Sequence, residues 1–185
     1  MRDATVDSHR WSRAEYDRAA AAGVFSADAR LELIDGEILD MTPQGSRHAT
    51  AFSLVADAVQ RAFGSGYYVR LQLPLALADD SEPEPDIAVV EGDVRDYRDE
   101  HPRTAVLIVE VSDDSLRRDR TVKQRLYARC GVPDYWILSL ADAHLEIHRD
   151  PGEGGYRTVI VRRAGETVAP LSRPAATIRV SDLLP

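Results

Sequence analysis

The chain has 185 residues, 44% of them hydrophobic, and this length and composition predict a single domain over residues 1–185 with one sizeable core. Its one cysteine, Cys130, excludes an intrachain disulfide, and no apolar run approaches membrane-spanning length, so we expect a cytoplasmic protein with no membrane partner. The net charge of −8, from 31 acidic and 23 basic residues, argues against a generic nucleic-acid binder but is compatible with a localised basic patch.

Two local patterns indicate the first expected elements. Ser12 to Glu15 form a capping-box pattern that opens an Ala-rich helix to about residue 22. Asp35-Gly36 stands between two runs that contain apolar residues, within residues 30–41, and predicts a hairpin with a two-residue turn. A terminal helix with a structural role is the favoured interpretation of the first pattern.

Two polar residues in this region are candidates for more than structure. Glu32 lies in the first strand of the hairpin, on the face opposite its leucine neighbours, where a solvent-facing position is the favoured interpretation from the residues alone. A second helix is expected from about Ser46 to Phe63, with its apolar residues on one stripe. His48 lies in the first turn of that helix; it is either a surface or capping residue or points into a neighbouring site.

Alternation of apolar and polar residues predicts a strand from Tyr67 to Leu77, with Pro74 placing part of it at an edge or bulge. The chain then turns back into an apolar run, so the two segments are expected to form an antiparallel hairpin. Gln72 would lie on the polar face, either near the acidic residues that follow or in an ordinary cross-strand hydrogen bond.

Two short Val- and Ile-rich runs, residues 84–90 and 104–111, read as buried strands, and each carries a carboxylate. Asp86 stands at the mouth of the first, and Glu110 stands near the end of the second, between two valines. Burying an ionised carboxylate without a partner is costly, so a metal, a cation or a dense set of hydrogen bonds is implied. Two such acids on neighbouring strands suggest a divalent metal site.

The helix expected after the second strand is the one place where this acidic chain concentrates positive charge. Residues 112–115 supply candidate N-caps, Gly131 ends the helix, and Leu116, Val122, Leu126 and Tyr127 are its apolar residues. Its basic residues are Arg117, Arg118, Arg120, Lys123, Arg125 and Arg129. A solvated amphipathic face would explain them, but the junction aims the first turns at Glu110, and Lys123, about two turns in, could reach it. Short strands are expected at residues 134–138, 144–148 and 156–162, and weak pairing at residues 177–180.

An ordered set of motifs resembles the Uma2 family of bacterial restriction-endonuclease-like proteins, which belongs to the PD-(D/E)XK nuclease superfamily. The match spans roughly residues 10–140, and residues 141–185 would form a C-terminal β-extension. The residues that carry the resemblance are Glu32-Leu33-Ile34-Asp35-Gly36-Glu37, His48, Pro85-Asp86, Glu110-Val111-Ser112, Asp119-Arg120, Lys123, Tyr127 and Gly131-Val132-Pro133-Asp134-Tyr135-Trp136-Ile137.

The resemblance implies an α/β (α+β) fold with a restriction-endonuclease-like core, in which helices flank a mixed β-sheet. It also implies that Asp86 and Glu110 hold Mg²⁺ or Mn²⁺, with Glu32 as a further acidic ligand or a water-positioning group. In the superfamily pattern a lysine stands two residues after the second acid, where this chain has Ser112. The resemblance implies that in this family the lysine lies instead on the following helix, where this chain has Lys123.

The function implied is a metal-dependent endonuclease that hydrolyses DNA, and analogy with the superfamily implies a homodimer. Lys123 would stabilise charge at the scissile phosphate or orient the attacking water. Gln72 and His48 would support the acids, and Arg117, Arg118 and Arg120 would contact flanking phosphates. Two alternatives stay open: a nuclease-fold binding or regulatory module without cleavage activity, and an enzyme that acts on RNA or a small phosphodiester.

Overall fold

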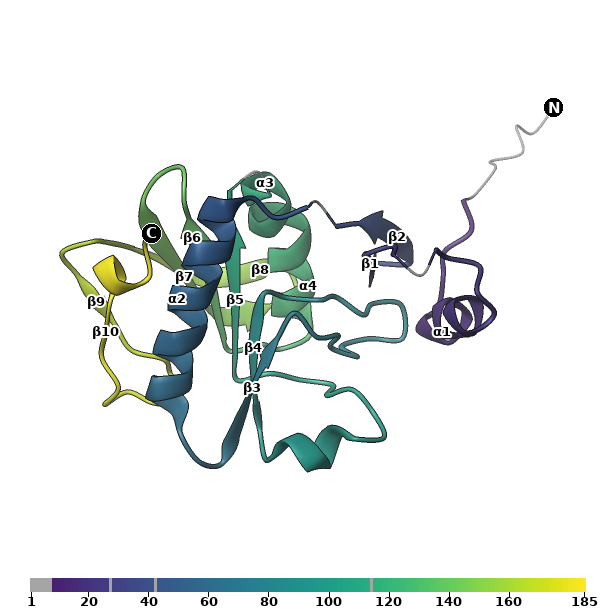
Figure 1. The fold of residues 1–185 in the computed structure, drawn as a ribbon, viewed down its shortest axis with the longest axis horizontal. Coiled ribbons are helices and arrows are strands. Elements are labelled where there is room, and N and C mark those ends of the chain that lie inside the picture. The colour runs from purple at the N-terminus through teal and green to yellow at the C-terminus, as the bar shows by residue number, and fades with distance from the viewer. Residues whose placement is uncertain (1–7, 27, 42, 114) are drawn as a thin grey trace.

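The computed structural model describes residues 8–26, 28–41, 43–113 and 115–185, and its centre is a six-stranded sheet in the order β3-β4-β5-β6-β7-β8 (Figure 1). The neighbours β5 and β6 pair in parallel and the other neighbouring strands pair antiparallel. The predicted mixed sheet flanked by helices is therefore confirmed. The strands are β3 (Tyr67–Leu71), β4 (Ile87–Glu91), β5 (Leu107–Ser112), β6 (Asp134–Ser139), β7 (His144–Gly152) and β8 (Gly155–Arg163).

Each face of the sheet has its own apolar layer, because side chains alternate along the strands. Val109 and Val111 of β5 belong to the cluster formed with α2 (Ser46–Phe63), which crosses one face (Figure 1). Ile108 belongs to the cluster on the opposite face, with Leu126 of α4 (Gln124–Arg129). The same alternation turns Glu110 toward α4, so the acid of β5 lies on the face that carries the basic helical segment.

The N-terminal part of the described chain lies at one end of the molecule (Figure 1). Ser12 and Glu15 form the predicted capping box at the start of α1 (Arg13–Ala21). The predicted hairpin is confirmed as well, with strands β1 (Leu31–Ile34) and β2 (Glu37–Asp40). Its turn residues, Asp35 and Gly36, have φ values of 52° and 75°, the left-handed backbone that a two-residue hairpin turn requires.

The strand predicted from Tyr67 to Leu77 is shorter in the structure and ends at Leu71. Gln72 has a φ of 49°, which takes the chain out of the sheet, and its amide donates to the Asp86 carbonyl at 3.0 Å. Pro74 has no amide hydrogen to continue a ladder. The pairing of β3 with β4 is antiparallel, as predicted, and a short 3₁₀ helix, η1 (Val94–Tyr97), follows β4.

The predicted single helix after β5 consists of three pieces: α3 (Leu116–Arg118), a π-turn labelled η2 (Asp119–Lys123), and α4. Of the candidate N-caps, Ser115 holds the N-cap position but makes no capping hydrogen bond. Its hydroxyl and that of Ser112 each donate to Asp119 Oδ2 at 2.6 Å instead. Asp114, another candidate cap, lies outside the described residues.

The C-terminal segment covers the sheet beside α2. It contains β9 (Thr167–Val168), β10 (Ile178–Arg179) and η3 (Val180–Asp182), and its apolar side chains join the α2 cluster. β7 and β8 are longer than predicted, so that the turn between them narrows to residues 153–154. Within the described ranges, none of the helices has both the length and the apolar character needed to cross a bilayer.

A buried carboxylate at the start of β6 fastens this C-terminal segment. Asp134 accepts hydrogen bonds from Trp136 Nε1 at 2.8 Å, from Arg149 Nε at 2.9 Å and from the Leu171 amide at 2.9 Å. Its replacement by alanine leaves the buried Trp136 donor and two part-buried donors without their acceptor, so we expect the free energy of unfolding to fall by about 3 kcal/mol. Urea unfolding measures the change.

Asp182 offers a matched control, because it pairs with Arg179 on the exposed surface at 3.0 Å. Asp182→Ala should change the free energy of unfolding by less than about 1 kcal/mol. Equal effects of the two substitutions would show that Asp134 does not fasten the segment.

Candidate active site

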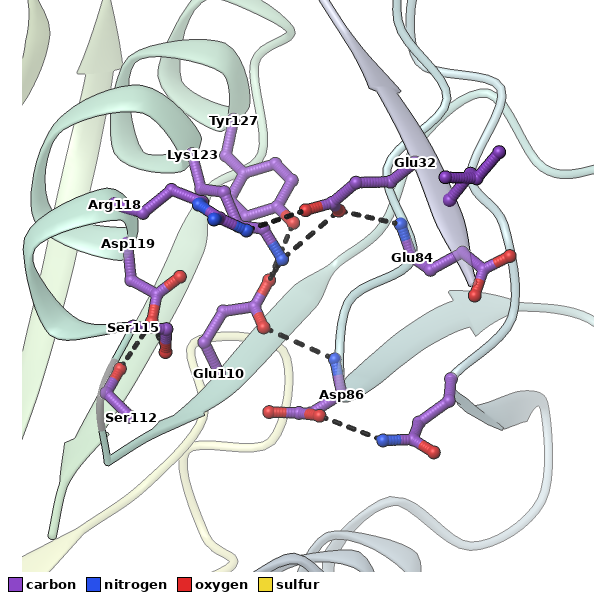
Figure 2. A network of polar contacts seen from close by, with 12 residues as sticks. Glu32, Glu84, Asp86, Glu110, Ser112, Ser115, Arg118, Asp119, Lys123 and Tyr127 are labelled. Atoms are coloured by element: carbon purple, nitrogen blue, oxygen red, sulfur yellow. Dashed lines mark hydrogen bonds and ion pairs between the residues drawn. The ribbon is translucent and has the colours of Figure 1, made fainter. Parts of the chain in front are cut away.

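Asp86 and Glu110 lie side by side because of the register between β4 and β5 (Figure 2). Ile87 pairs with Val109 in antiparallel strands, which places Asp86, the residue before β4, beside Glu110. The paired apolar side chains belong to the α2 cluster, so the two acids point to the opposite face. The Val111 amide donates to Asp86 Oδ2 at 2.8 Å, and the Asp86 amide donates to Glu110 Oε2 at 3.4 Å.

Neighbouring donors favour the ionised form of Asp86. Its Oδ1 accepts a hydrogen bond from Gln72 Nε2 at 3.1 Å, and His48 Nε2 lies 3.5 Å from the same oxygen. Burial alone would raise the pKa of Asp86, but His48 and the Val111 amide outweigh that effect and lower the pKa. The carboxylate in turn raises the pKa of His48. Among the described residues, the buried His48 Nε2 makes no well-aligned hydrogen bond, so its contact with Asp86 is that of an ion pair.

Glu110 contacts both a cation and a phenol of the helical segment. Its Oε1 accepts hydrogen bonds from Lys123 Nζ at 3.0 Å and from the Tyr127 hydroxyl at 2.8 Å (Figure 2). Burial raises the pKa of Glu110 to about 8, against the opposing effect of the Lys123 ammonium. Burial would also lower the pKa of Lys123, but Glu110 and Glu32 more than offset this, and the pKa of Lys123 is raised. Lys123 therefore carries its positive charge at neutral pH.

Glu32 is only 1% exposed, and its interpretation as a solvent-facing strand residue is wrong. The segment before β4 pairs with β1 at an isolated antiparallel bridge between Leu33 and Glu82, which brings this segment beside Glu32. Glu32 Oε2 lies 3.3 Å from Lys123 Nζ and accepts from the Glu84 amide at 3.4 Å, while Oε1 lies 3.9 Å from Arg118 Nη1. The hairpin thus brings a third carboxylate to the basic side chains of the helical segment.

The π-turn decides which residues of this segment face the acids. In an α-helix of 3.6 residues per turn, side chains four residues apart do not point in quite the same direction. A π-turn has more residues per turn, so it rotates the following side chains back toward the same face. Asp119, Lys123 and Tyr127 are consequently all buried, whereas Val122 is 37% exposed and does not lie on the predicted apolar stripe. π-turns are rare in proteins, and a large share of those that occur lie at functional sites.

The three arginines predicted to contact phosphates differ in their surroundings. Arg118 lies at the cavity beside Glu32, and Arg117 is exposed, with no ion pair among the described residues. Arg120 donates through Nε to Glu146 of β7 at 2.9 Å and lies 3.5 Å from Asp142. Because its guanidinium is already paired, this geometry does not support a phosphate contact for Arg120.

The acids and Lys123 line a cavity of about 150 Å³. Carboxylate oxygens are the hard ligands that Mg²⁺ and Mn²⁺ prefer. No group of three or more His, Cys, Asp or Glu residues in the described ranges could hold a metal ion by itself. Mg²⁺ commonly takes only one or two carboxylates and fills its shell with water or substrate oxygens, so Asp86 and Glu110 fit it as a pair. Both oxygens of Glu32 already lie near cations, Oε2 near Lys123 and Oε1 near Arg118, so Glu32 fits its other predicted role, that of a water-positioning group, better than that of a ligand.

Sequence reasoning missed two contacts of the site. The Tyr127 hydroxyl was treated as part of an apolar stripe, although Tyr127 follows Lys123 by four residues and so shares its helix face. Ser112, at the position of the superfamily lysine, binds Asp119 and ties the π-turn to the end of β5. A further signal was open to inspection: Lys123 is the only lysine among 23 basic residues.

Comparisons with known proteins concern the family and the fold of the chain. A family model described as Uma2, putative restriction endonuclease, matches residues 13–181. The fold is similar to that of a solved structure described as a putative nuclease belonging to DUF820, from Anabaena variabilis ATCC 29413. That structure matches with a TM-score of 0.71 and 17% sequence identity, over 94% of this chain and 97% of the other. None of the curated proteins compared with the chain matches it.

Proposed function

Since the chain belongs to the Uma2 family of putative restriction endonucleases, a nuclease family, we propose that it is a metal-dependent endonuclease that hydrolyses phosphodiester bonds of DNA. One observation carries the proposal: Asp86 directly before β4, Glu110 of β5 and Lys123 of η2 converge on one cavity. A solvated amphipathic helix, the simpler interpretation of the basic segment, does not account for a buried lysine between two carboxylates.

Asp86 and Glu110 are the residues that would hold Mg²⁺ or Mn²⁺. When bound, the ion would neutralise charge on the phosphoryl oxygens and make a water molecule more acidic. Gln72 and His48 contact Asp86 Oδ1 and orient its carboxylate. They are therefore supporting groups, because a carboxylate held from two sides loses little rotational freedom when it takes up a ligand.

Lys123 is placed to stabilise negative charge as it develops on the phosphate. A preorganised cation in a cavity shielded from water stabilises such charge far better than one in bulk solvent. Glu32 binds Lys123 from the side of the hairpin and holds it in position. Arg118 at the cavity and the exposed Arg117 are the side chains we assign to flanking phosphates, which position a strand without reading its sequence.

Cleavage of supercoiled plasmid and of single-stranded DNA tests the proposal. We expect wild-type protein to cleave both in Mg²⁺ or Mn²⁺ and to cleave neither in a chelator, because Asp86 and Glu110 alone supply no positive charge to the phosphate. Cleavage of RNA but not DNA would keep the site and change the substrate. If no substrate is cut in either metal, the binding or regulatory module becomes the better interpretation.

The same assay separates a monomer from a homodimer. The described residues contain one such site, so one chain cuts one strand and yields open-circular plasmid. Linear product formed in one binding event would indicate that two copies act together, as the homodimer hypothesis requires.

A further inference from the structure

Resting on that function, we propose that Tyr127 is a positioning residue: its hydroxyl holds Glu110 Oε1 on the side of α4 and leaves Oε2, beside Asp86, as the oxygen for the metal ion. Tyr127 would touch neither the ion nor the phosphate, so it acts only through Glu110. The inference depends on how unequally the two oxygens of Glu110 are occupied.

The two oxygens of Glu110 have different neighbours. Oε1 accepts two short hydrogen bonds, at 2.8 Å from the Tyr127 hydroxyl and at 3.0 Å from Lys123 Nζ. Oε2 accepts one long hydrogen bond, at 3.4 Å from the Asp86 amide. A carboxylate oxygen accepts about two hydrogen bonds, so the capacity of Oε1 is filled and that of Oε2 is not. The less occupied oxygen lies toward the other predicted ligand.

The two donors to Oε1 differ in what a substrate does to them. A phosphate attracts the Lys123 ammonium, and a lysine side chain is long and flexible. The Tyr127 ring is fully buried and packs edge-to-face on Tyr135 with centroids 4.9 Å apart, which restrains its hydroxyl. Tyr127 is also uncharged, so it holds the carboxylate without repelling a cation. Tyr127 therefore keeps Glu110 oriented even when the charge of Lys123 is shared between Glu110 and the substrate.

The test is calorimetric titration of Mn²⁺ into folded protein without DNA, with Tyr127→Phe compared with Tyr156→Phe. Tyr156 is a matched control because its buried hydroxyl donates to the Val132 carbonyl at 2.8 Å, outside the cavity. We expect Tyr127→Phe to weaken Mn²⁺ binding about tenfold, as losses of groups that orient a ligand do, and Tyr156→Phe to leave it unchanged. Cleavage by Tyr127→Phe should recover at saturating metal, since Glu110 is still present.

A second readout needs no metal. Lys123 is the only lysine, so lysine labelled with ¹⁵N at Nζ gives a single NMR resonance. This resonance should shift in Tyr127→Phe but not in Tyr156→Phe. Wild-type affinity in Tyr127→Phe, or equal weakening in both variants, would overturn the inference and leave the proposed nuclease intact. Failure of the wild type to bind Mn²⁺ would instead overturn the metal site itself, and this inference with it.

Discussion

Asp86→Ala is expected to abolish metal binding and to lower DNA cleavage by about 10³-fold, because a metal ion supplies several kcal/mol of charge stabilisation in the transition state. Asp86 is the acid whose neighbours keep it ionised: Gln72 and the Val111 amide donate to it, and its pKa is lowered. It is therefore ready to bind a cation at neutral pH without releasing a proton. Calorimetry with Mn²⁺ and plasmid cleavage measure the two losses.

Two further variants separate charge from structure. Asp86→Asn keeps the shape and one acceptor oxygen of the side chain, so it should fold like the wild type while losing metal affinity and cleavage. Asp182→Asn removes a charge from the exposed C-terminal segment, outside the cavity, and it should keep wild-type turnover. Wild-type affinity for Mn²⁺ in Asp86→Asn would show that this carboxylate is not a ligand.

The central strands could be predicted because their apolar residues are unusually continuous. Residues 84–90 and 104–111 each match a buried strand, and each run is too short for a typical helix. The end of β3 could not be predicted in the same way. Alternation continues past Leu71 in the sequence, and what stops the strand is a left-handed Gln72 whose amide and side chain both bind Asp86. Tertiary contacts there override the local pattern.

The site was predictable where it depends on strand pairing and unpredictable where it depends on helix register. Glu110 stands between two valines, which indicates a buried charge, and the antiparallel pairing of β4 with β5 brings Asp86 beside it. No residue preference predicts a π-turn, so the expected inward position of Lys123 rested on its distance along the helix and on the resemblance, and not on the helix register. Arg120 was assigned to phosphates for the same reason: its partner Glu146 lies 26 residues away, on a strand whose register the sequence does not reveal.

Glu32 shows how a correct local pattern can give a wrong environment. The alternation of the hairpin places it opposite Leu33, as expected, but a face is solvated only if nothing else covers it. In the structure the Glu84 amide donates to Glu32 on that face, and Lys123 supplies the counter-charge that burial requires. The composition offered one hint. Lys123 is the one lysine among 23 basic residues, and a lysine differs from an arginine in having a compact charge on a flexible stem.

Lys123→Met is expected to lower DNA cleavage at saturating metal by about 10²-fold, the usual effect of removing one preorganised group that stabilises developing charge. Methionine matches the length of the lysine stem and removes only the ammonium. Metal affinity should change by less than about tenfold, because two effects oppose each other. Loss of the ammonium removes a charge that repels the ion, but it also raises the pKa of Glu110 further, so that protons compete more strongly for the carboxylate.

The separation of these two quantities identifies the role of Lys123. Its removal also leaves Glu32 and Glu110 buried without a counter-charge, so turnover must be measured per folded molecule, with folding checked by circular dichroism. Lys123→Arg is the control: it restores the charge but not the compact shape, and it should cleave faster than Lys123→Met yet more slowly than the wild type. Wild-type cleavage by Lys123→Met would reduce Lys123 to a structural counter-ion of the two acids and leave Arg118 as the candidate cation of the cavity.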